Sequence, residues 1–349
     1  MKMSPMKMSI VDLAVIKPGQ TATDALQQSL EMAVLAEELG YHRIWFAEHH
    51  LAPAQASHHP ELLIAAAGAR TRRIRLGSGA VLLNHYSPFK VAEMFMQLDA
   101  MYPGRIDLGL GRASTGRVTD LALRRDRQSQ SVDDHGTQVT EVVAWTHNAF
   151  PDDHPFANKP LVETVPSRPD LWLLGSSPGG ALLAARLGIG YSFAGFINPF
   201  AAAAALRTYR ENFVPTPFGS GAPRAMLGVN VSMGATNEEG QRLALSAKGY
   251  YHRLARGQLK AFVPTIEEAD REIGPAERDE ATSIADGRWP RFVAGGPHEV
   301  RTTIERMVEQ SGADEIMLQS LIADPADRQR SFSLIADTFD LRAREDAAA

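Results

Sequence analysis

The chain has 349 residues, of which 44% are hydrophobic and 22% charged, and its formal net charge is −5. This composition provides a large core, and the acidic balance argues against a nucleic acid or an anionic membrane as the main partner, because both select a basic surface. The chain contains no cysteine, which excludes disulfides, thiolate nucleophiles and cysteine-ligated metals. Redox chemistry therefore requires an organic cofactor, or a metal held by histidine and carboxylate groups.

The amino-terminal residues do not resemble a signal peptide. Residues 1–9 include Lys2 and Lys7 but no apolar segment of the kind that signal peptides contain. No apolar run in the chain approaches the length of a membrane span. We therefore expect a cytoplasmic protein with no membrane partner.

Short apolar runs alternate with segments of helical periodicity along the whole chain. Strands are expected at residues 10–16, 44–47, 74–83, 106–110, 171–174, 191–195, 226–232 and 316–321. The first helix is expected to begin with Thr23 as N-cap and to end at Gly40. Further helices are expected at residues 60–70, 88–101, 180–187, 199–212, 238–256, 298–310 and 326–339. Eight strands that alternate with helices predict an α/β protein, specifically a (β/α)8 TIM barrel, and a doubly wound sheet is the alternative.

Two connections are longer than a simple βα unit needs. They follow the fourth and seventh strands and cover residues 113–169 and 234–313. Loops of this length in a compact domain are usually lids or binding loops. We therefore expect one barrel domain over residues 1–349, with these two insertions as a candidate substrate cover.

Charged residues recur where the expected strands begin. Arg43, Arg73 and Arg105 each precede an isoleucine, and Asp314-Glu315 precedes Ile316. Residues that enter the strands lie at the amino-terminal face of a barrel, which serves stability more often than catalysis. We therefore interpret these charges as architectural.

The second expected strand ends in a carboxylate and two imidazoles, in the order Trp45-Phe46-Ala47-Glu48-His49-His50. Three interpretations are open. The residues could be a polar strand end, a metal site together with His58 and His59, or a site where one histidine is an acid, base or hydrogen-bond donor. Adjacent histidines on a strand point in opposite directions, and no HExxH spacing is present, so the metal interpretation is the weakest.

Glycine-rich stretches follow two other strands. Gly77-Ser78-Gly79-Ala80 interrupts an apolar strand, which indicates either tight packing or close approach of a ligand to the backbone. Gly175-Ser176-Ser177-Pro178-Gly179-Gly180 lies between a strand and a helix, where backbone N–H groups and hydroxyls bind anions. Arg112, just after the fourth strand, could supply a cation for a phosphate.

Taken together and in this order, five segments resemble the bacterial luciferase-like flavin monooxygenases. The resemblance covers nearly the whole chain and is clearest over residues 9–113. The segments are Ala36-Glu37-Glu38-Leu39-Gly40-Tyr41, Ala47-Glu48-His49-His50, Arg73-Ile74-Arg75-Leu76-Gly77-Ser78-Gly79, Lys90-Val91-Ala92-Glu93 and Tyr102-Pro103-Gly104-Arg105-Ile106-Asp107-Leu108-Gly109-Leu110-Gly111-Arg112.

The resemblance implies a (β/α)8 barrel that uses reduced FMN and O2 to insert one oxygen atom into a small organic substrate through a peroxyflavin. It implies that His49 is catalytic with support from Glu48, whereas His50 is expected only to pack. The flavin ring is expected against Ser78, Gly79 and Ala80, where family members often have a non-proline cis peptide. The flavin phosphate is expected near Arg112, Ser176, Ser177, Gly179 and Gly180, and no metal is expected. A separate flavin reductase and a homodimer are also implied.

The chain departs from the family pattern at three places: Gly180 replaces a hydroxyl residue, Asn84-His85-Tyr86 differs at the third-strand rim, and Gly195-Phe196-Ile197 lacks the usual histidine. The first departure leaves phosphate binding at this turn to backbone donors. Three alternatives to the monooxygenase follow from the same residues: an F420-dependent hydride-transferring oxidoreductase, a non-catalytic flavin-binding protein, and a metal hydrolase on the same fold.

Overall fold

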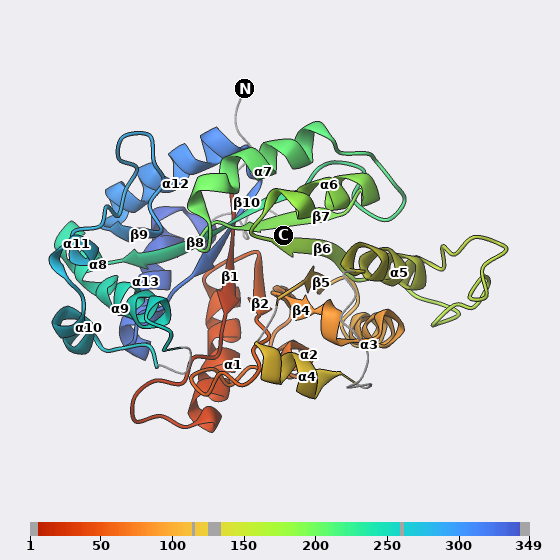
Figure 1. The fold of residues 1–349 in the computed structure, drawn as a ribbon, viewed down its shortest axis with the longest axis horizontal. Helices are drawn as coiled ribbons and strands as arrows, with labels where there is room; N and C mark the ends of the chain where they lie inside the picture. The colour runs from red at the N-terminus through yellow and green to blue at the C-terminus, as the bar shows by residue number, and fades with distance from the viewer. Residues whose placement is uncertain (1–5, 114–115, 125–133, 259–261, 343–349) are drawn as a thin grey trace.

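A closed ring of parallel strands forms the centre of the molecule (Figure 1). The structure is a computed structural model that describes residues 6–113, 116–124, 134–258 and 262–342. The ring consists of β1 (Lys7–Asp12), β2 (Arg43–Phe46), β3 (Arg75–Ser78), β5 (Ile106–Gly111), β6 (Asp170–Gly175), β7 (Gly190–Ala194), β8 (Ala225–Met233) and β10 (Glu315–Gln319). Strand β10 pairs with both β1 and β8, which closes the ring. The predicted (β/α)8 barrel is therefore confirmed.

Two short strands in the structure differ from the sequence-based prediction. The expected continuous strand 74–83 is wrong, because β3 ends at Ser78 and β4 (Val81–Leu82) pairs separately with β5. The peptide bond between Gly79 and Ala80, which lies in this break, is cis, as the resemblance implies. Strand β9 (Phe292–Gly295) was not predicted. It pairs with the carboxyl-terminal half of β8, after β8 has separated from β10.

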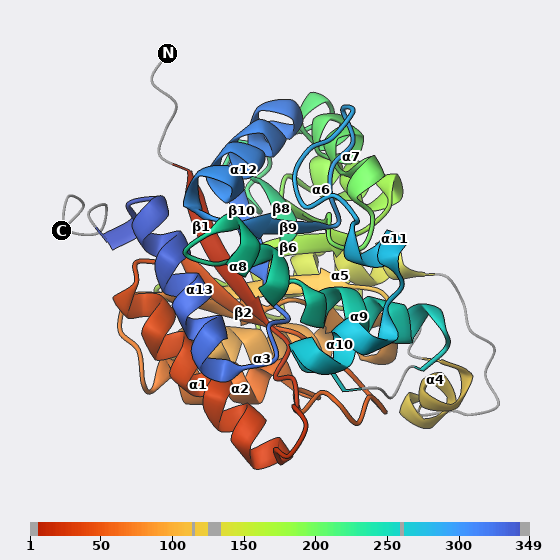
Figure 2. The same ribbon diagram turned by 90° about the vertical axis from the view of Figure 1, so that its left-hand side faces the viewer.

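Helices cover the outside of the ring in both views of Figures 1 and 2. They include α1 (Ala22–Glu38), α2 (Pro60–Gly68), α3 (Pro88–Met101), α6 (Pro178–Leu187), α7 (Pro199–Glu211), α12 (Pro297–Ser311) and α13 (Pro325–Thr338). The predicted N-cap of α1, Thr23, is wrong. Thr21 is the N-cap, since Thr21 and Asp24 form a capping box whose two reciprocal hydrogen bonds satisfy backbone N–H groups that would otherwise lack partners.

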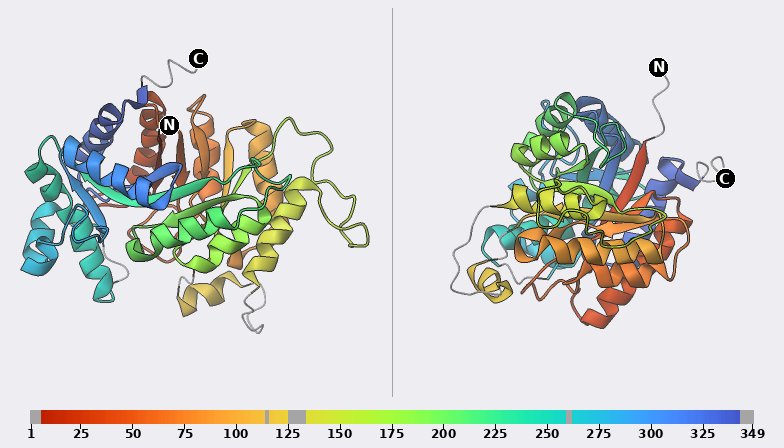
Figure 3. Two further views of the ribbon diagram at one scale, coloured as in Figure 1. Left: turned by 90° about the horizontal axis from the view of Figure 1, so that it is seen from above. Right: turned by 90° about the vertical axis from the view of Figure 1, so that its right-hand side faces the viewer.

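The first long connection contains α4 (Arg117–Leu123) and α5 (His135–His147) and then projects from the barrel over residues 148–169 (Figure 3). The base of the projection is an aromatic cluster in which the ring of Trp145 lies 4.7 to 4.9 Å from the rings of Phe89, Phe150 and Phe156. This packing orders the segment without regular secondary structure. Residues 125–133 of this connection lie outside the described residues.

Two helices of the second long connection, α9 (Leu245–Ala255) and α10 (Ile266–Glu272), lie near the carboxyl end of β1 (Figure 2). The connection also contains α8 (Asn237–Leu243) and α11 (Pro275–Arg278). The single helix expected at 238–256 is therefore two helices, separated at Ala244. Ala247 and Val263 from this connection pack in one buried cluster with Leu13 and Leu321, so the connection covers the interior of the barrel. Among the described helices, none combines the length and apolar composition that crossing a bilayer requires.

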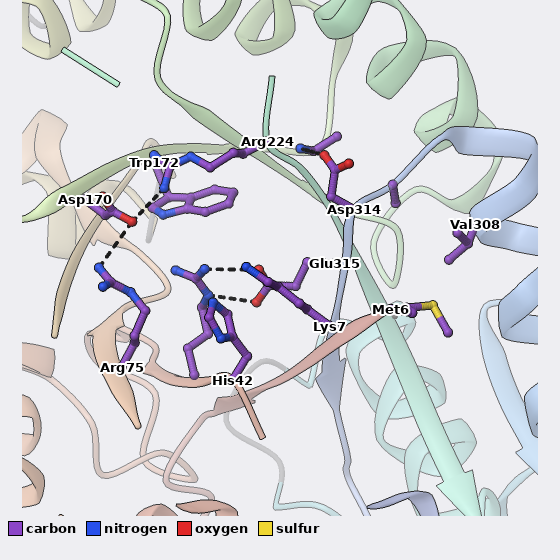
Figure 4. Close-up of a pocket in the computed structure, with 13 residues that line it drawn as sticks. Met6, Lys7, His42, Arg75, Asp170, Trp172, Arg224, Val308, Asp314 and Glu315 are labelled. Carbon is purple, nitrogen blue, oxygen red and sulfur yellow. Dashed lines mark hydrogen bonds and ion pairs between the residues drawn. The ribbon is translucent and has the colours of Figure 1, made fainter. Parts of the chain in front are cut away.

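The amino-terminal end of the barrel contains a buried ion-pair network beside a cavity of about 580 Å³ (Figure 4). The Arg43 guanidinium donates to Asp107 and Glu315, both at 2.7 Å, and Arg75 donates to Asp107 at 2.6 Å. The architectural role predicted for Arg43 and Glu315 is consistent with this position. Arg75 rather than the exposed Arg73 takes part, because the Arg75 side chain points into the ring of strands.

Candidate active site

Glu48 connects three segments at the carboxyl-terminal end of the barrel. Its side chain is buried; it accepts hydrogen bonds from the Leu82 N–H at 2.9 Å and the Tyr86 hydroxyl at 2.8 Å, and it pairs with His50 Nε2 at 2.6 Å. Burial, and then the Glu48 carboxylate, raise the pKa of Tyr86 well above its usual value. Tyr86 therefore remains a protonated donor that holds the loop after the helical turn η1 (Leu83–His85) against the end of β2.

His49 lies next to Glu48 but is held by different groups. Its backbone N–H donates to the Ser57 carbonyl at 2.9 Å, and its own carbonyl contacts Nδ1 of His58 at 2.7 Å. Within the described part of the chain, the buried Nδ1 of His49 has no hydrogen-bond partner. Burial lowers the pKa of His49 to about 4, and the nearby His50 and His58 act in the same direction. His49 is therefore a neutral imidazole at physiological pH.

The histidine that hydrogen-bonds to Glu48 is His50, which the sequence analysis expected only to pack. The His50 ring also stacks on His58, with ring centroids 6.4 Å apart and planes at 18°, and meets the edge of His59 at 6.1 Å. These three histidines line a cavity of about 650 Å³ that Leu123 of α4 also borders. Among the described residues, no group of three or more His, Asp or Glu side chains is arranged to hold a metal ion.

Gly79 packs closely against side chains of β1 and β2. A Cβ atom added at Gly79 would lie 3.1 Å from Trp45 Cβ and 3.2 Å from Val11 Cγ2, so a side chain there would crowd the interior. Ser78 has a different role, because its hydroxyl donates to the Gly109 carbonyl at 2.9 Å and accepts from the Gly109 N–H at 3.0 Å. Both hydrogen bonds join β3 to β5, and the Ser78 hydroxyl is therefore already used within the protein.

The residues expected at a phosphate gather at the ends of two neighbouring strands. Leu110 of β5 pairs with Leu173 of β6, so Arg112 and the turn that begins at Gly175 leave the barrel side by side. Ser177 is the N-cap of α6, and its side chain makes no capping hydrogen bond. A Cβ added at Gly179 would have no heavy atom within 4 Å. Ser176, Ser177, Gly179 and Gly180 therefore lie in one donor-rich turn after β6, and Arg112 follows the neighbouring strand β5.

Buried polar groups at the same end of the barrel were missed in the sequence analysis. Within the described residues, Asn230 Oδ1, Ser232 Oγ and Ser320 Oγ are buried and have no hydrogen-bond partner. Asn230 and Ser232 alternate with apolar residues along β8, which is the period of one strand face. That alternation is the signal that could have identified them as interior positions.

The (β/α)8 barrel, together with relatives named monooxygenases, defines a class of protein, a flavin-dependent enzyme that incorporates oxygen from O2. The chain belongs to the luciferase-like monooxygenase family, whose model matches residues 6–315. The predicted family membership is therefore confirmed.

Similar proteins cover almost all of the chain. A luciferase-like monooxygenase of Escherichia coli (strain K12) is 37% identical over 94% of this chain and 96% of its own length. The N-acetyl-S-alkylcysteine monooxygenase of Bacillus subtilis (strain 168) is 33% identical over 95% of this chain and 97% of its own length. The crystal structure of apo-MsnO8 superposes with a TM-score of 0.85 at 40% identity and covers 96% of this chain and 99% of that chain.

More distant structures share the fold alone. A type II Baeyer–Villiger monooxygenase in complex with FMN has a TM-score of 0.70 at 20% identity, over 96% of this chain and 98% of that chain. An F420-dependent secondary alcohol dehydrogenase has a TM-score of 0.66 at 16% identity, over 97% and 99%. Barrels of this fold are therefore found with FMN and with F420, and the fold alone does not identify the cofactor.

Proposed function

We propose that the protein uses reduced FMN, supplied by a separate flavin reductase, and O2 to insert one oxygen atom into a small organic substrate. The observation that carries this proposal is the position of a neutral His49, whose buried Nδ1 has no hydrogen-bond partner among the described residues, at the same barrel end as the donor-rich turn after β6. The relatives named monooxygenases favour FMN over F420, because an F420 enzyme transfers hydride rather than oxygen.

The residues at this end of the barrel fit a flavin. The flavin phosphate requires a cation and several hydrogen-bond donors, and the ends of β5 and β6 supply both. Arg112, the Ser176 and Ser177 hydroxyls and the backbone N–H groups of Gly179 and Gly180 would hold the phosphate. When bound, reduced FMN supplies the electrons that activate O2.

His49 would act as a neutral hydrogen-bond donor and acceptor at the reacting oxygen. A neutral imidazole carries one N–H donor and one acceptor nitrogen, and the unpartnered Nδ1 of His49 is available for either role. Glu48 would act indirectly, since it holds His50 and Tyr86 in place. The apolar cover formed by Ala247 and Val263 would exclude water from the site.

Oxygen-isotope transfer tests this proposal. The test substrate is N-acetyl-S-benzylcysteine, a member of the class that the B. subtilis relative is named for. The protein receives this substrate with reduced FMN and ¹⁸O₂, and mass spectrometry measures the mass of the product. We expect one ¹⁸O atom in the product. Tight anaerobic binding of F420, with no binding of reduced FMN, would overturn the proposal.

The role of His49 has its own test. His49→Asn should lower the rate of oxygen transfer roughly 100-fold or more, the usual scale for loss of an acid, base or donor group, while anaerobic binding of reduced FMN changes little. His59→Asn, at a half-exposed neighbour, is the matched control. Wild-type turnover by His49→Asn would show that the role is wrong.

A further inference from the structure

A mainly apolar cavity lies beside the loop that carries His49. Its volume of about 650 Å³ is within the usual range of pockets that bind small molecules. The loops after β1 and β2 and helix α4 form its walls, and the apolar side chains that line it are Ile16, Leu51, Pro53, Leu123 and four alanines. No Lys, Arg, Asp or Glu is among the described residues that line it. The cavity therefore offers no counter-ion to a charged group and suits an uncharged one.

Leu51 contributes to this apolar surface although most of the residue faces solvent. It is 62% exposed, and its backbone φ is 48°, in the left-handed region that a leucine seldom adopts. Neither the exposure of the side chain nor this backbone conformation favours folding. A bound apolar group would remove the Leu51 side chain from water, so the residue is suited to binding rather than to stability.

His50 lines the same cavity, and one of its ring nitrogens is fixed as a donor. The Glu48 carboxylate only accepts hydrogen bonds, so Nε2 of His50 donates in their 2.6 Å contact. The other nitrogen of a neutral imidazole then carries a lone pair. Within the described residues Nδ1 of His50 has no hydrogen-bond partner, and the side chain is 11% exposed. Nδ1 is therefore an available acceptor in the wall of a mainly apolar cavity.

The His50 ring is held in one orientation by groups of the candidate active site. The Glu48 carboxylate also accepts hydrogen bonds from a backbone N–H and a tyrosine hydroxyl, so it cannot turn without breaking them. The face of the His50 ring stacks on His58, whose Nδ1 contacts the His49 carbonyl at 2.7 Å. The wall of the cavity and the candidate active site are therefore joined by direct contacts through Glu48 and His49.

We propose that this cavity binds an uncharged aromatic or branched alkyl part of the substrate that bears an O–H or N–H donor, and that His50 accepts the hydrogen bond. The apolar walls supply affinity, and His50 distinguishes a molecule with a donor from its ether. A carboxylate is disfavoured, because no cation lines the cavity and the Glu48 carboxylate lies behind His50. The inference relies on the proposed function only in treating the bound molecule as the substrate.

Binding of three naphthalene probes without flavin tests the site independently of oxygen transfer. 2-Naphthol bears a donor, 2-methoxynaphthalene has the same ring without a donor, and 2-naphthoate is an anion. Fluorescence titrations at pH 8, above the usual pKa of imidazole, measure the affinity of each. Wild type should bind 2-naphthol about three- to tenfold more tightly than 2-methoxynaphthalene, the scale of one neutral hydrogen bond, and should bind 2-naphthoate most weakly.

A cavity-filling variant tests where the probes bind. Ala122 lies on α4, is exposed and lines the cavity, so Ala122→Trp should fill part of it without disturbing the core. This variant should weaken binding of 2-naphthol and 2-methoxynaphthalene alike, by about tenfold or more. Ala204→Trp, at an exposed alanine of α7 that does not line the cavity, is the matched control and should bind both probes as wild type does.

The role of His50 is tested by removing its acceptor nitrogen. His50→Phe keeps an aromatic ring in the wall, so it should still bind 2-methoxynaphthalene but no longer prefer 2-naphthol. Retained binding of the ether shows that the cavity of the variant is folded. His298→Phe, at an exposed histidine of α12, is the control and should keep the preference.

A measurement on wild type does not depend on how the variants fold. In protein with nitrogen-15 histidine, Nδ1 of His50 should resonate as an unprotonated nitrogen at pH 8, and 2-naphthol but not its ether should shift it. A protonated Nδ1 overturns the proposal. Equal binding of 2-naphthol and its ether by wild type, no binding of either, a kept preference in His50→Phe or unchanged binding by Ala122→Trp does so as well. Donor-selective binding without transfer of ¹⁸O would instead contradict the proposed function and leave this site intact.

Discussion

Two partly buried histidines at opposite ends of the barrel stay neutral for the same main reason. Burial lowers the pKa of His42 to about 4, with Arg43 acting in the same direction, and burial lowers the pKa of His49 similarly. His42 lines the amino-terminal cavity and His49 lies at the carboxyl-terminal end. Titration alone therefore does not distinguish an architectural histidine from a candidate catalytic one, and position in the fold is needed.

These histidines predict that acid destabilises the protein. The unfolded chain takes up a proton on each histidine near pH 6.5, whereas the folded protein does so only near pH 4. Stability is therefore lost as pH falls through that window, by about 1.4 kcal/mol per pH unit for each histidine. In urea unfolding at pH 7, 6 and 5, His42→Gln should show a shallower loss than wild type, while His59→Gln should match wild type. An unchanged slope in His42→Gln would contradict the prediction.

At the scale of elements, glycines set how closely neighbouring strands approach. A Cβ at Gly109 of β5 would lie 2.0 Å from the Ser78 carbonyl oxygen of β3, a backbone atom that cannot move alone. The same two residues exchange the hydroxyl hydrogen bonds that join these strands. This contact explains why β3 ends at Ser78 and the chain continues separately as β4.

Gly109→Ala should therefore destabilise the protein by at least about 1–3 kcal/mol, the usual penalty for overpacking a core. Gly136→Ala is the matched control, because the nearest atom to its added Cβ is 3.9 Å away and the residue lies in α5. This control should be neutral or stabilising by up to about 1 kcal/mol. Thermal unfolding of the two variants measures the difference, and equal midpoints would refute the argument.

At the scale of the whole molecule, one ion-pair network joins strands from both halves of the chain (Figure 4). Arg43 of β2 pairs with Asp107 of β5 and Glu315 of β10, and Asp170 of β6 pairs with Arg75 and Arg224. The network lies at the barrel end opposite His49. The barrel thus separates stability at one end from the candidate chemistry at the other.

Arg43→Met should lower the free energy of unfolding by about 3–5 kcal/mol, because it leaves two buried carboxylates without their shared partner. Arg278→Met, which breaks an exposed pair with Asp270, should cost less than about 1 kcal/mol. Chemical unfolding checks both values. The folded fraction of Arg43→Met should still bind reduced FMN, and loss of flavin binding in that fraction would show that the two ends are coupled.

Local signals determined much of the fold. The order and type of the eight barrel strands follow from short apolar runs and helical periodicity, which are properties of neighbouring residues. The predicted strand boundaries were wrong where a contact between residues far apart in the sequence decides where a strand begins or ends. Strand β9 forms only because the end of β8 is free to pair with it, and the break after Ser78 depends on Gly109.

The sequence by itself determined the class of fold and identified the polar residues that follow β2, β5 and β6. Both can be recognised because a strand end or a glycine-rich turn is a pattern of consecutive residues. Only the tertiary structure decided which of those polar groups form hydrogen bonds within the protein and which have no partner there. It pairs Glu48 with His50, uses the Ser78 hydroxyl between strands, and brings Arg328 to Asp12, 316 residues away, beside an unpartnered Lys17. The contact between Arg328 and Asp12 depends on closure of the barrel, which joins the first strand to the last.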